Sequence, residues 1–179
     1  MTGIIRRIDH LGRVVVPKEM RKSLRIKDGD PLEIVKDGGG IVLRKYSPLE
    51  NIVTVAESVA KSIYEITEKV CVITDTDKVI YAVGKAKELI GDSLSKKLTK
   101  ALEERKSLIL YSGGGSEVIS ITEENKIDYK SQIIVPIING GDCYGAIIVI
   151  DSATNLEFNA KDLNLIRLGA NLLSEQFGV

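Results

Sequence analysis

The chain has 179 residues, of which 44% are hydrophobic and 28% are charged, and its formal net charge at pH 7 is +0. This length suits one large domain or two small ones, and the composition is that of an ordinary globular protein. Because the longest apolar runs, 133–138 and 146–150, are too short to cross a bilayer and residues 1–7 lack the apolar segment of a signal peptide, we expect a cytoplasmic protein without a membrane segment.

The net charge of zero is the sum of two oppositely charged parts. Residues 1–46 contain 11 Lys/Arg and six Asp/Glu, whereas the remaining 133 residues contain 14 Lys/Arg and 19 Asp/Glu. A short basic segment joined to an acidic body indicates one surface that binds a polyanion. A solvated basic face without a partner would have the same composition, so charge alone does not choose between the two interpretations.

Four short strands and one helix are predicted in the basic segment. Residues 9–12 and the glycine-rich 37–40 have the composition of turns, and Pro17 suits the first position of a helix, where its missing N–H costs nothing. A further turn is expected at 28–30. The expected strands are 3–8, 13–16, 31–35 and 41–46, and the expected helix is 17–24.

The basic segment is too small to build a hydrophobic core alone. A length of about 46 residues is near the limit for folding without disulfides or metals. Its strands are apolar at nearly every position that is not charged, so they need cover on both faces. We therefore expect an obligate homodimer in which hairpins of two chains interleave. The apolar positions are Ile4, Ile5, Ile8, Val14, Val15, Val16, Leu32, Ile34, Val35, Ile41, Val42 and Leu43.

The same residues resemble a known family of DNA-binding domains. The runs 2–9 (TGIIRRID), 11–21 (LGRVVVPKEMR) and 29–34 (GDPLEI) are similar to the AbrB-type swapped-hairpin domain of bacterial transition-state regulators. The resemblance implies a β-barrel-like dimer, woven from two chains, that contacts DNA through arginines at 6, 13 and 21 and the basic residues beside them. The expected DNA-binding residues are Arg6, Arg7, Arg13, Lys18, Arg21 and Lys22.

The chemistry of these side chains favours double-stranded DNA as the partner. Guanidinium groups bind phosphates in a bidentate manner and also reach guanine edges. Tyr46 is the only aromatic residue before position 64, which argues against a base-stacking surface for single strands or RNA. A duplex read partly through its shape fits this composition better.

Two amphipathic helices are expected on either side of the remaining core. Residues 47–50 (SPLE) have the pattern of a capping box that starts a helix running to Glu68, and residues 159–162 (NAKD) have the pattern of a second helix start. Apolar residues recur at steps of three and four in both helices, either to pack on the domain's own sheet or to meet a partner chain. We favour a mixed role, with a four-helix bundle that joins dimers into a tetramer. The expected dimerisation stripe is Ile52, Ala56, Val59, Ile63, Leu163, Ile166, Ala170 and Leu173.

Between these helices the sequence predicts an antiparallel sheet with helices on one face. The order of elements, the run 135–138 (VPII), a glycine turn and the run 144–150 (YGAIIVI) are similar to a GAF domain, the small-molecule sensor of many signalling proteins. This resemblance implies an unidentified small-molecule effector as one possible partner. The expected strands are 70–74, 78–83, 107–111, 117–122, 132–138 and 143–151, and the expected helices are 86–90 and 95–105.

No catalytic residues, bound metal or cofactor are expected. His10 is the only histidine, and Cys71 and Cys143 lack the spacing of metal ligands. Both cysteines lie in apolar stretches, so buried thiols are favoured over a disulfide. Asp75 and Asp77 stand at a hairpin tip that is open to water, and we interpret them as turn formers rather than as paired catalytic carboxylates.

These observations predict an α+β protein with three segments. Residues 1–47 form a swapped-hairpin β-barrel domain for dimerisation and DNA binding, 48–69 a linker helix that also packs with the next domain, and 70–179 a GAF-like antiparallel sheet flanked by helices. The order of segments resembles a family of sporulation regulators of spore-forming Firmicutes. That resemblance implies a tetrameric transcription regulator, activator and repressor, of forespore genes.

Two other functions fit parts of the sequence. Swapped-hairpin domains also occur in antitoxins, but an antitoxin normally has a short disordered tail, whereas this chain continues for about 130 residues with a full apolar core. The second alternative is an enzyme of the GAF fold that the basic domain anchors. No nucleophile paired with a base supports this alternative, so we do not expect an enzyme.

Overall fold

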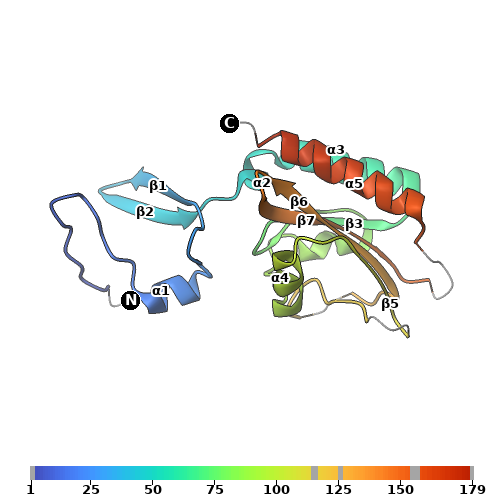
Figure 1. Ribbon diagram of the computed structural model, residues 1–179, viewed down its shortest axis with the longest axis horizontal. Helices are drawn as coiled ribbons and strands as arrows, with labels where there is room; N and C mark the ends of the chain where they lie inside the picture. The colour runs from blue at the N-terminus through green and yellow to red at the C-terminus, as the bar shows by residue number, and fades with distance from the viewer. Residues whose placement is uncertain (1–2, 114–116, 125–126, 154–157, 178–179) are drawn as a thin grey trace. The chain divides into compact units, whose positions relative to one another are not determined.

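The computed structural model describes residues 3–113, 117–124, 127–153 and 158–177. The chain forms two compact units, Met1–Tyr46 and Ser47–Val179, each with its own strands and helices (Figure 1). In the described ranges, no helix is both long and apolar enough to cross a membrane.

The first unit contains one short helix and one hairpin. α1 spans Lys18–Ser23 and follows Pro17 directly. The strands β1 (Leu32–Asp37) and β2 (Gly40–Lys45) pair antiparallel along their full length. Gly38 lies in their connection at a φ of 55°, a conformation that glycine adopts without strain.

Two expected strands of the first unit are not formed. Residues 3–8 and 13–16 lie on either side of the turn at 9–12 without a β-ladder between them. A backbone hydrogen bond runs from the Asp9 N–H to the Arg13 carbonyl at 3.1 Å. A strand is defined by hydrogen bonds to a neighbouring strand, and the single chain offers these segments no such neighbour. The prediction of strands over 3–8 and 13–16 is therefore wrong for the isolated chain.

The first unit also lacks a hydrophobic core of its own. Among its described residues, Pro17 alone is buried. Ile5 is 91% exposed, Ile41 75% and Val15 74%, which is unusual for large aliphatic side chains. A single chain thus leaves the apolar surface of this unit in water. The exposed large apolar residues are Ile4, Ile5, Ile8, Leu11, Val14, Val15, Met20, Leu24, Ile34, Ile41, Val42, Leu43 and Tyr46.

The second unit is built on one five-stranded antiparallel sheet. Its strands lie in the order β4-β3-β7-β6-β5, with the long pair β6 and β7 near the centre. Alternate residues of these strands belong to two separate hydrophobic cores, so both faces of the sheet are buried. The strands are β3 (Val70–Thr74), β4 (Val79–Ala82), β5 (Leu108–Tyr111), β6 (Ser131–Asn139) and β7 (Asp142–Asp151).

Helices cover both faces of this sheet, not one as expected. α3 (Val53–Thr67) and α5 (Ala160–Glu175) lie side by side on one face, which we call the near face (Figure 1). α4 (Lys96–Glu103) and the short 3₁₀ helix η1 (Gly84–Leu89) contribute to the core on the opposite, far face. The strands are apolar on both sides, and each side therefore needs its own cover.

The helix expected to start at Ser47 is divided in two. α2 covers Pro48–Asn51, and α3 begins only after Ile52, whose φ of −117° interrupts the helix. Ser47 makes no side-chain cap hydrogen bond, so the expected capping box is not formed. Leu49 is fully buried in the near core, and this packing fixes the first turn in place of the cap.

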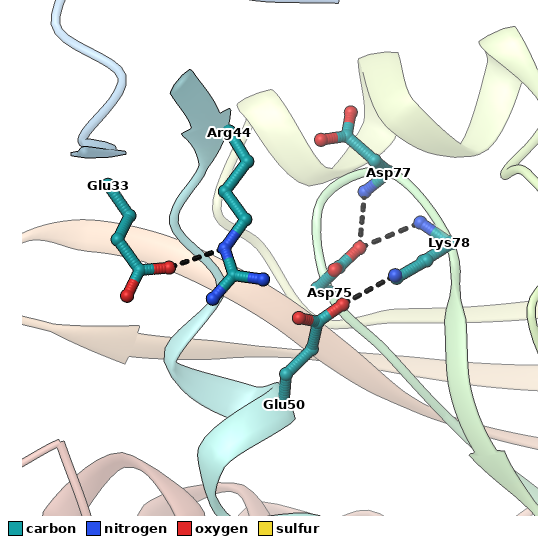
Figure 2. A network of polar contacts seen from close by, with 6 residues as sticks. All are labelled: Glu33, Arg44, Glu50, Asp75, Asp77 and Lys78. Carbon is teal, nitrogen blue, oxygen red and sulfur yellow. Dashed lines mark hydrogen bonds and ion pairs between the residues drawn. The ribbon is translucent and has the colours of Figure 1, made fainter. Parts of the chain in front are cut away.

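A buried carboxylate shapes the turn between β3 and β4. The Asp75 carboxylate accepts hydrogen bonds from the backbone N–H groups of Asp77 and Lys78, each at 2.7 Å (Figure 2). Burial raises the pKa of Asp75, and the two N–H groups act in the opposite direction. The Lys78 ammonium also pairs with Glu50 of α2 at 2.5 Å, which ties α2 to this turn. Asp75 is thus a turn former, as the sequence indicated, but it is 6% exposed, so the expectation that this position is open to water is wrong.

The expected dimerisation stripe lies inside the second unit's own core. Gly169 lets α3 and α5 approach closely, because a Cβ at this position would lie 3.0 Å from Val59 Cγ1 and 3.1 Å from Ile147 Cδ1. The helical spacing found the core-facing stripe and not a surface that is free for a partner, which corrects the prediction. Ala56, Ile63, Ile166, Ala170 and Leu173 are buried, and Ile52, Val59 and Leu163 are partly buried against the same cluster.

The segment 117–122 on the far face does not form its expected strand. A side chain of β6, Gln132, hydrogen-bonds to the backbone of this segment. The Gln132 Oε1 accepts the Ile119 N–H at 2.9 Å, and the Gln132 Nε2 donates to the Ile119 carbonyl at 3.0 Å. Gln132 is fully buried. Its amide therefore satisfies the N–H and the carbonyl of Ile119. The strand prediction over 117–122 is wrong.

A substitution at Gly145 tests the close approach of β7 to β3. Gly145 has a φ of 153°, and a Cβ there would lie 1.9 Å from the Thr74 carbonyl oxygen. We expect Gly145→Ala to lower the free energy of unfolding by about 3 kcal/mol, since backbone strain and overpacking add. The measurement is chemical denaturation of the second unit, followed by far-ultraviolet circular dichroism.

Gly140→Ala is the matched control. Gly140 has a φ of 59°, but no atom lies within 4 Å of its would-be Cβ. This variant should lose only the backbone contribution, about 1 kcal/mol. Equal losses in the two variants would show that the contact with the Thr74 carbonyl does not matter.

Candidate nucleic-acid interface

The turn of the first unit positions Arg13. The Asp9 carboxylate accepts the N–H groups of Leu11 and Arg13, each at 2.9 Å, and the Arg13 Nε at 2.7 Å. The backbone N–H and then the side chain of Arg13 hold the pKa of Asp9 below its ordinary value. Gly12 completes the turn at a φ of 79°. The Arg13 side chain remains 70% exposed, so its guanidinium is oriented but still open to a ligand.

Three of the six predicted residues lie together on α1. Lys18 and Lys22 are four residues apart and Arg21 is three residues from Lys18, so helical geometry brings them to one side. Arg21 Nη1 pairs with Asp28 Oδ1 at 3.0 Å, which holds α1 to the following turn. Lys18 and Lys22 are exposed, and the structure records no ion pair for them within the described residues.

The other three predicted residues flank the turn. Arg6 and Arg7 precede it and are exposed, again without an ion pair in the part of the chain that the structure describes. The cations of the β1–β2 hairpin differ, because Arg44 pairs with Glu33 at 2.6 Å (Figure 2) and Lys45 with an aspartate of the preceding turn at 3.3 Å. Charge that is neutralised within the hairpin is less available to phosphates than the charge of Arg6, Arg7, Lys18 and Lys22.

Sequence reasoning missed two functional carboxylates of this surface. Asp9 was expected to form the turn, but not to orient Arg13, and the spacing of four residues was the available signal. Asp28 holds Arg21 from seven residues away across an irregular segment, and no periodic pattern indicates such a pair. Each of these carboxylates holds one of the predicted DNA-binding arginines in place.

The second unit offers little nucleophilic chemistry. Cys71 is a buried free thiol, and burial raises its pKa to about 12. Cys143 is partly buried, also free, and burial raises its pKa as well. The thiolate is the reactive form of cysteine, so neither group is activated at neutral pH. No group of three or more His, Cys, Asp or Glu among the described residues is placed to hold a metal ion.

Comparisons with known proteins match both units. Residues 51–178 match the family described as "Stage V sporulation protein T C-terminal, transcription factor", and residues 5–51 match "Antidote-toxin recognition MazE, bacterial antitoxin". Stage V sporulation protein T of Bacillus subtilis (strain 168) is 37% identical over 150 residues, which are 83% of each chain. The transition state regulatory protein AbrB of the same organism is 53% identical over 47 residues, or 26% of this chain and 49% of the relative.

Solved structures resemble the second unit and confirm the α+β fold. A GAF domain/HD domain protein from Geobacter sulfurreducens has a TM-score of 0.55 at 14% identity, over 69% of this chain and 90% of the other. A type II free methionine-R-sulfoxide reductase from Thermoplasma acidophilum has a TM-score of 0.56 at 15% identity, over 72% and 94%. Identities this low show a shared fold alone, and the fold occurs in sensors and enzymes alike.

A basic unit similar to AbrB that precedes a unit of the stage V sporulation protein T C-terminal family defines a class of DNA-binding transcription regulators. The extent of both matches places this chain within that class. The chain belongs to the stage V sporulation protein T family. The family and the DNA-binding regulatory function that the sequence predicted are thereby confirmed.

Proposed function

We propose that this protein regulates sporulation genes in the forespore cytoplasm, where it activates some and represses others by binding double-stranded DNA. The observation that carries the proposal is the exposed, mostly unpaired basic surface of the first unit. Four of its six cations have no ion pair in the described residues. The proposed contact residues are Arg6, Arg7, Arg13, Lys18, Arg21 and Lys22.

The two kinds of cation on this surface have different tasks. Lysines without a carboxylate partner neutralise phosphates and release counterions, which supplies affinity that depends on salt. Arg13, which Asp9 orients at 2.7 Å, is suited to a defined bidentate contact with a phosphate or a guanine edge. We therefore propose that Arg13 fixes the position of the protein along the duplex, and that the lysines supply electrostatic affinity for DNA of any sequence.

Dimerisation of the first unit completes the DNA-binding surface. Thirteen large apolar side chains among the described residues of this unit are exposed in the single chain. The segments 3–8 and 13–16 have unpaired backbone and can form strands only against a second copy. Both features support a woven homodimer, in which each duplex meets two copies of the arginine and lysine surface.

A different stripe from the expected one is suited to join dimers into a tetramer. On α5, Leu168 is 56% exposed and Leu172 is 46% exposed, four residues apart on the side away from the core. On α3, the exposed apolar residues Tyr64 and Ile66 are two residues apart and lie on different sides of the helix. We propose that the outer side of α5 packs against the same side of α5 in another chain.

The role of the second unit follows from its packing. Leu94, Leu98 and Ile121 are buried in the far core, between the sheet and its cover. This supports assembly as the main task of the unit, and a small-molecule effector remains a prediction. The antitoxin alternative rests on the match of residues 5–51, whereas the second unit has the folded core that an antitoxin tail lacks.

The DNA-binding role is tested by Arg13→Ala. We expect affinity for duplex DNA to fall at least about tenfold, the effect of removing one oriented arginine, while the dimer stays folded. Fluorescence anisotropy at fixed salt measures the binding, and light scattering the mass. Arg44→Ala is the control, since its partner is Glu33 and it should bind nearly as the wild type does. Wild-type affinity in Arg13→Ala would remove the assigned role.

The woven dimer is tested with a fragment of residues 1–46. Because folding and association are then one step, its melting temperature should rise with protein concentration. The melting temperature is measured by circular dichroism over a dilution series. A range of roughly a hundredfold is needed to shift the melting temperature by a few degrees. A folded fragment whose melting temperature does not depend on concentration would contradict the interleaved arrangement.

The outer face of α5 is tested by the double variant Leu168→Gln/Leu172→Gln. Gln keeps helix propensity and removes apolar surface, so the tetramer should fall to dimers without loss of helix content. Sedimentation velocity measures the mass. The control is Arg167→Gln, an exposed position on the same helix. An unchanged tetramer in the double variant would exclude this face as the contact.

A further inference from the structure

A basic segment stands out within the acidic second unit. Residues 84–106 contain seven Lys/Arg and four Asp/Glu, whereas the rest of residues 47–179 contains seven Lys/Arg and 15 Asp/Glu. Half of the unit's cations thus lie in a short stretch that includes η1 and α4. Clustered charge of one sign in a body of the opposite sign points to a partner of complementary charge.

The centre of this segment is a lysine face on α4. Lys96, Lys97 and Lys100 are exposed, while Leu98 and Leu102 of the same helix are buried in the far core. The i, i+1, i+4 spacing brings the three ammonium groups to one side of the helix. The structure records no ion pair for these lysines within the described residues.

The helix holds this lysine face on a fixed frame. Ser95 caps it, because its hydroxyl accepts the Leu98 N–H at 3.1 Å and donates to the Ser120 carbonyl at 2.5 Å. Ser95 is buried, and the cap therefore ties the start of α4 to the cover of the far core. The lysine stems extend from a part of the unit that packing and hydrogen bonds hold in place.

The charges on α4 run against the helix dipole. Its first turn contains Lys96 and Lys97 and no acidic residue, although the positive end of a helix favours anions. Lys96 and Lys100 also repel each other at i, i+4. α5 follows the rule, since Asp162 in its first turn completes a capping box with Asn159. These lysines destabilise α4, and no contact within the described residues compensates for that. Such a conflict between sequence and stability indicates that the lysines bind a partner.

We propose that the lysine face of α4 is a second DNA-binding surface, which contacts phosphates of the duplex beside the segment that the first unit binds. The inference rests on the proposed function of the first unit. Protein interfaces are poor in lysine and rich in aromatic residues, and α4, all of which is described, carries no exposed aromatic or large apolar residue. Flexible ammonium groups without an apolar centre are instead typical of phosphate contacts that carry no sequence information.

The test uses the full chain with Lys96→Gln/Lys97→Gln/Lys100→Gln. Two duplexes share one sequence that the wild-type protein selects from a random library: a short one trimmed to the protected segment, and a long one extended by random sequence on both sides. The wild type should bind the long duplex more tightly and with a steeper salt dependence. The triple variant should lose that difference, and the slope of log affinity against log salt should fall by about 0.9 for each phosphate that is no longer neutralised.

A charge-matched control separates this face from a general loss of positive charge. Lys61→Gln/Lys130→Gln/Lys161→Gln removes the same number of charges from the same unit outside α4 and should keep the advantage of the long duplex. Circular dichroism of both triple variants checks the fold. Because the α4 lysines oppose the dipole and repel each other, their replacement should not lower thermal stability.

The outcomes distinguish the inference from the function on which it rests. If the wild type enriches no sequence from the random library and binds duplex DNA from it no more tightly than background, the proposed function itself fails. If the wild type binds the short duplex and the α4 variant keeps the full advantage on the long one, the second surface alone is refuted. An α4 variant that binds both duplexes as the wild type does but no longer activates transcription would assign the lysine face to an acidic protein surface, and this too would overturn the proposal.

Discussion

Apolar surface that one copy cannot bury is the constraint on which the first unit depends. Its described residues include one buried position, Pro17, against thirteen exposed large apolar side chains. Burial of apolar surface is the main force that holds a domain together, so a unit without a core needs a second copy to supply it. In the proposed dimer the same requirement would place two copies of the basic surface side by side, so that the need for a core and the geometry of DNA binding would have one physical origin.

The second unit satisfies its requirement for a core within one chain. Its sheet is apolar on both faces, and α3 and α5 cover one face while α4, η1 and the segment 117–122 cover the other. Close approaches at Gly145 and Gly169 and the buried amide of Gln132 make this packing possible. Because the core is complete, the surfaces left for partners are the outer side of α5, where Leu168 and Leu172 are exposed, and the basic face of α4.

Positive charge is unevenly distributed over the surfaces of the two units. In the first unit, carboxylates neutralise the hairpin cations and orient Arg13 and Arg21, while Arg6, Arg7, Lys18 and Lys22 have no ion pair within the described residues. In the second unit, positive charge gathers on and beside α4. A protein with a formal net charge of zero can thus attract a polyanion at chosen places while the rest of its surface repels it.

The sequence by itself determined the family, the two-unit order, most helices and strands, and the identity of the basic residues, because these depend on local patterns of charge, turn residues and apolar spacing. The tertiary structure decided the rest. Steps of three and four marked an apolar stripe on α3 and α5, but only packing shows that Ala56 and Ile166 face the chain's own sheet. Residues 117–122 form no strand, and Gln132 bonds the backbone of Ile119 through contacts that no local pattern encodes. Residues 3–8 and 13–16 form no ladder because strand pairing requires a neighbour that the single chain does not contain.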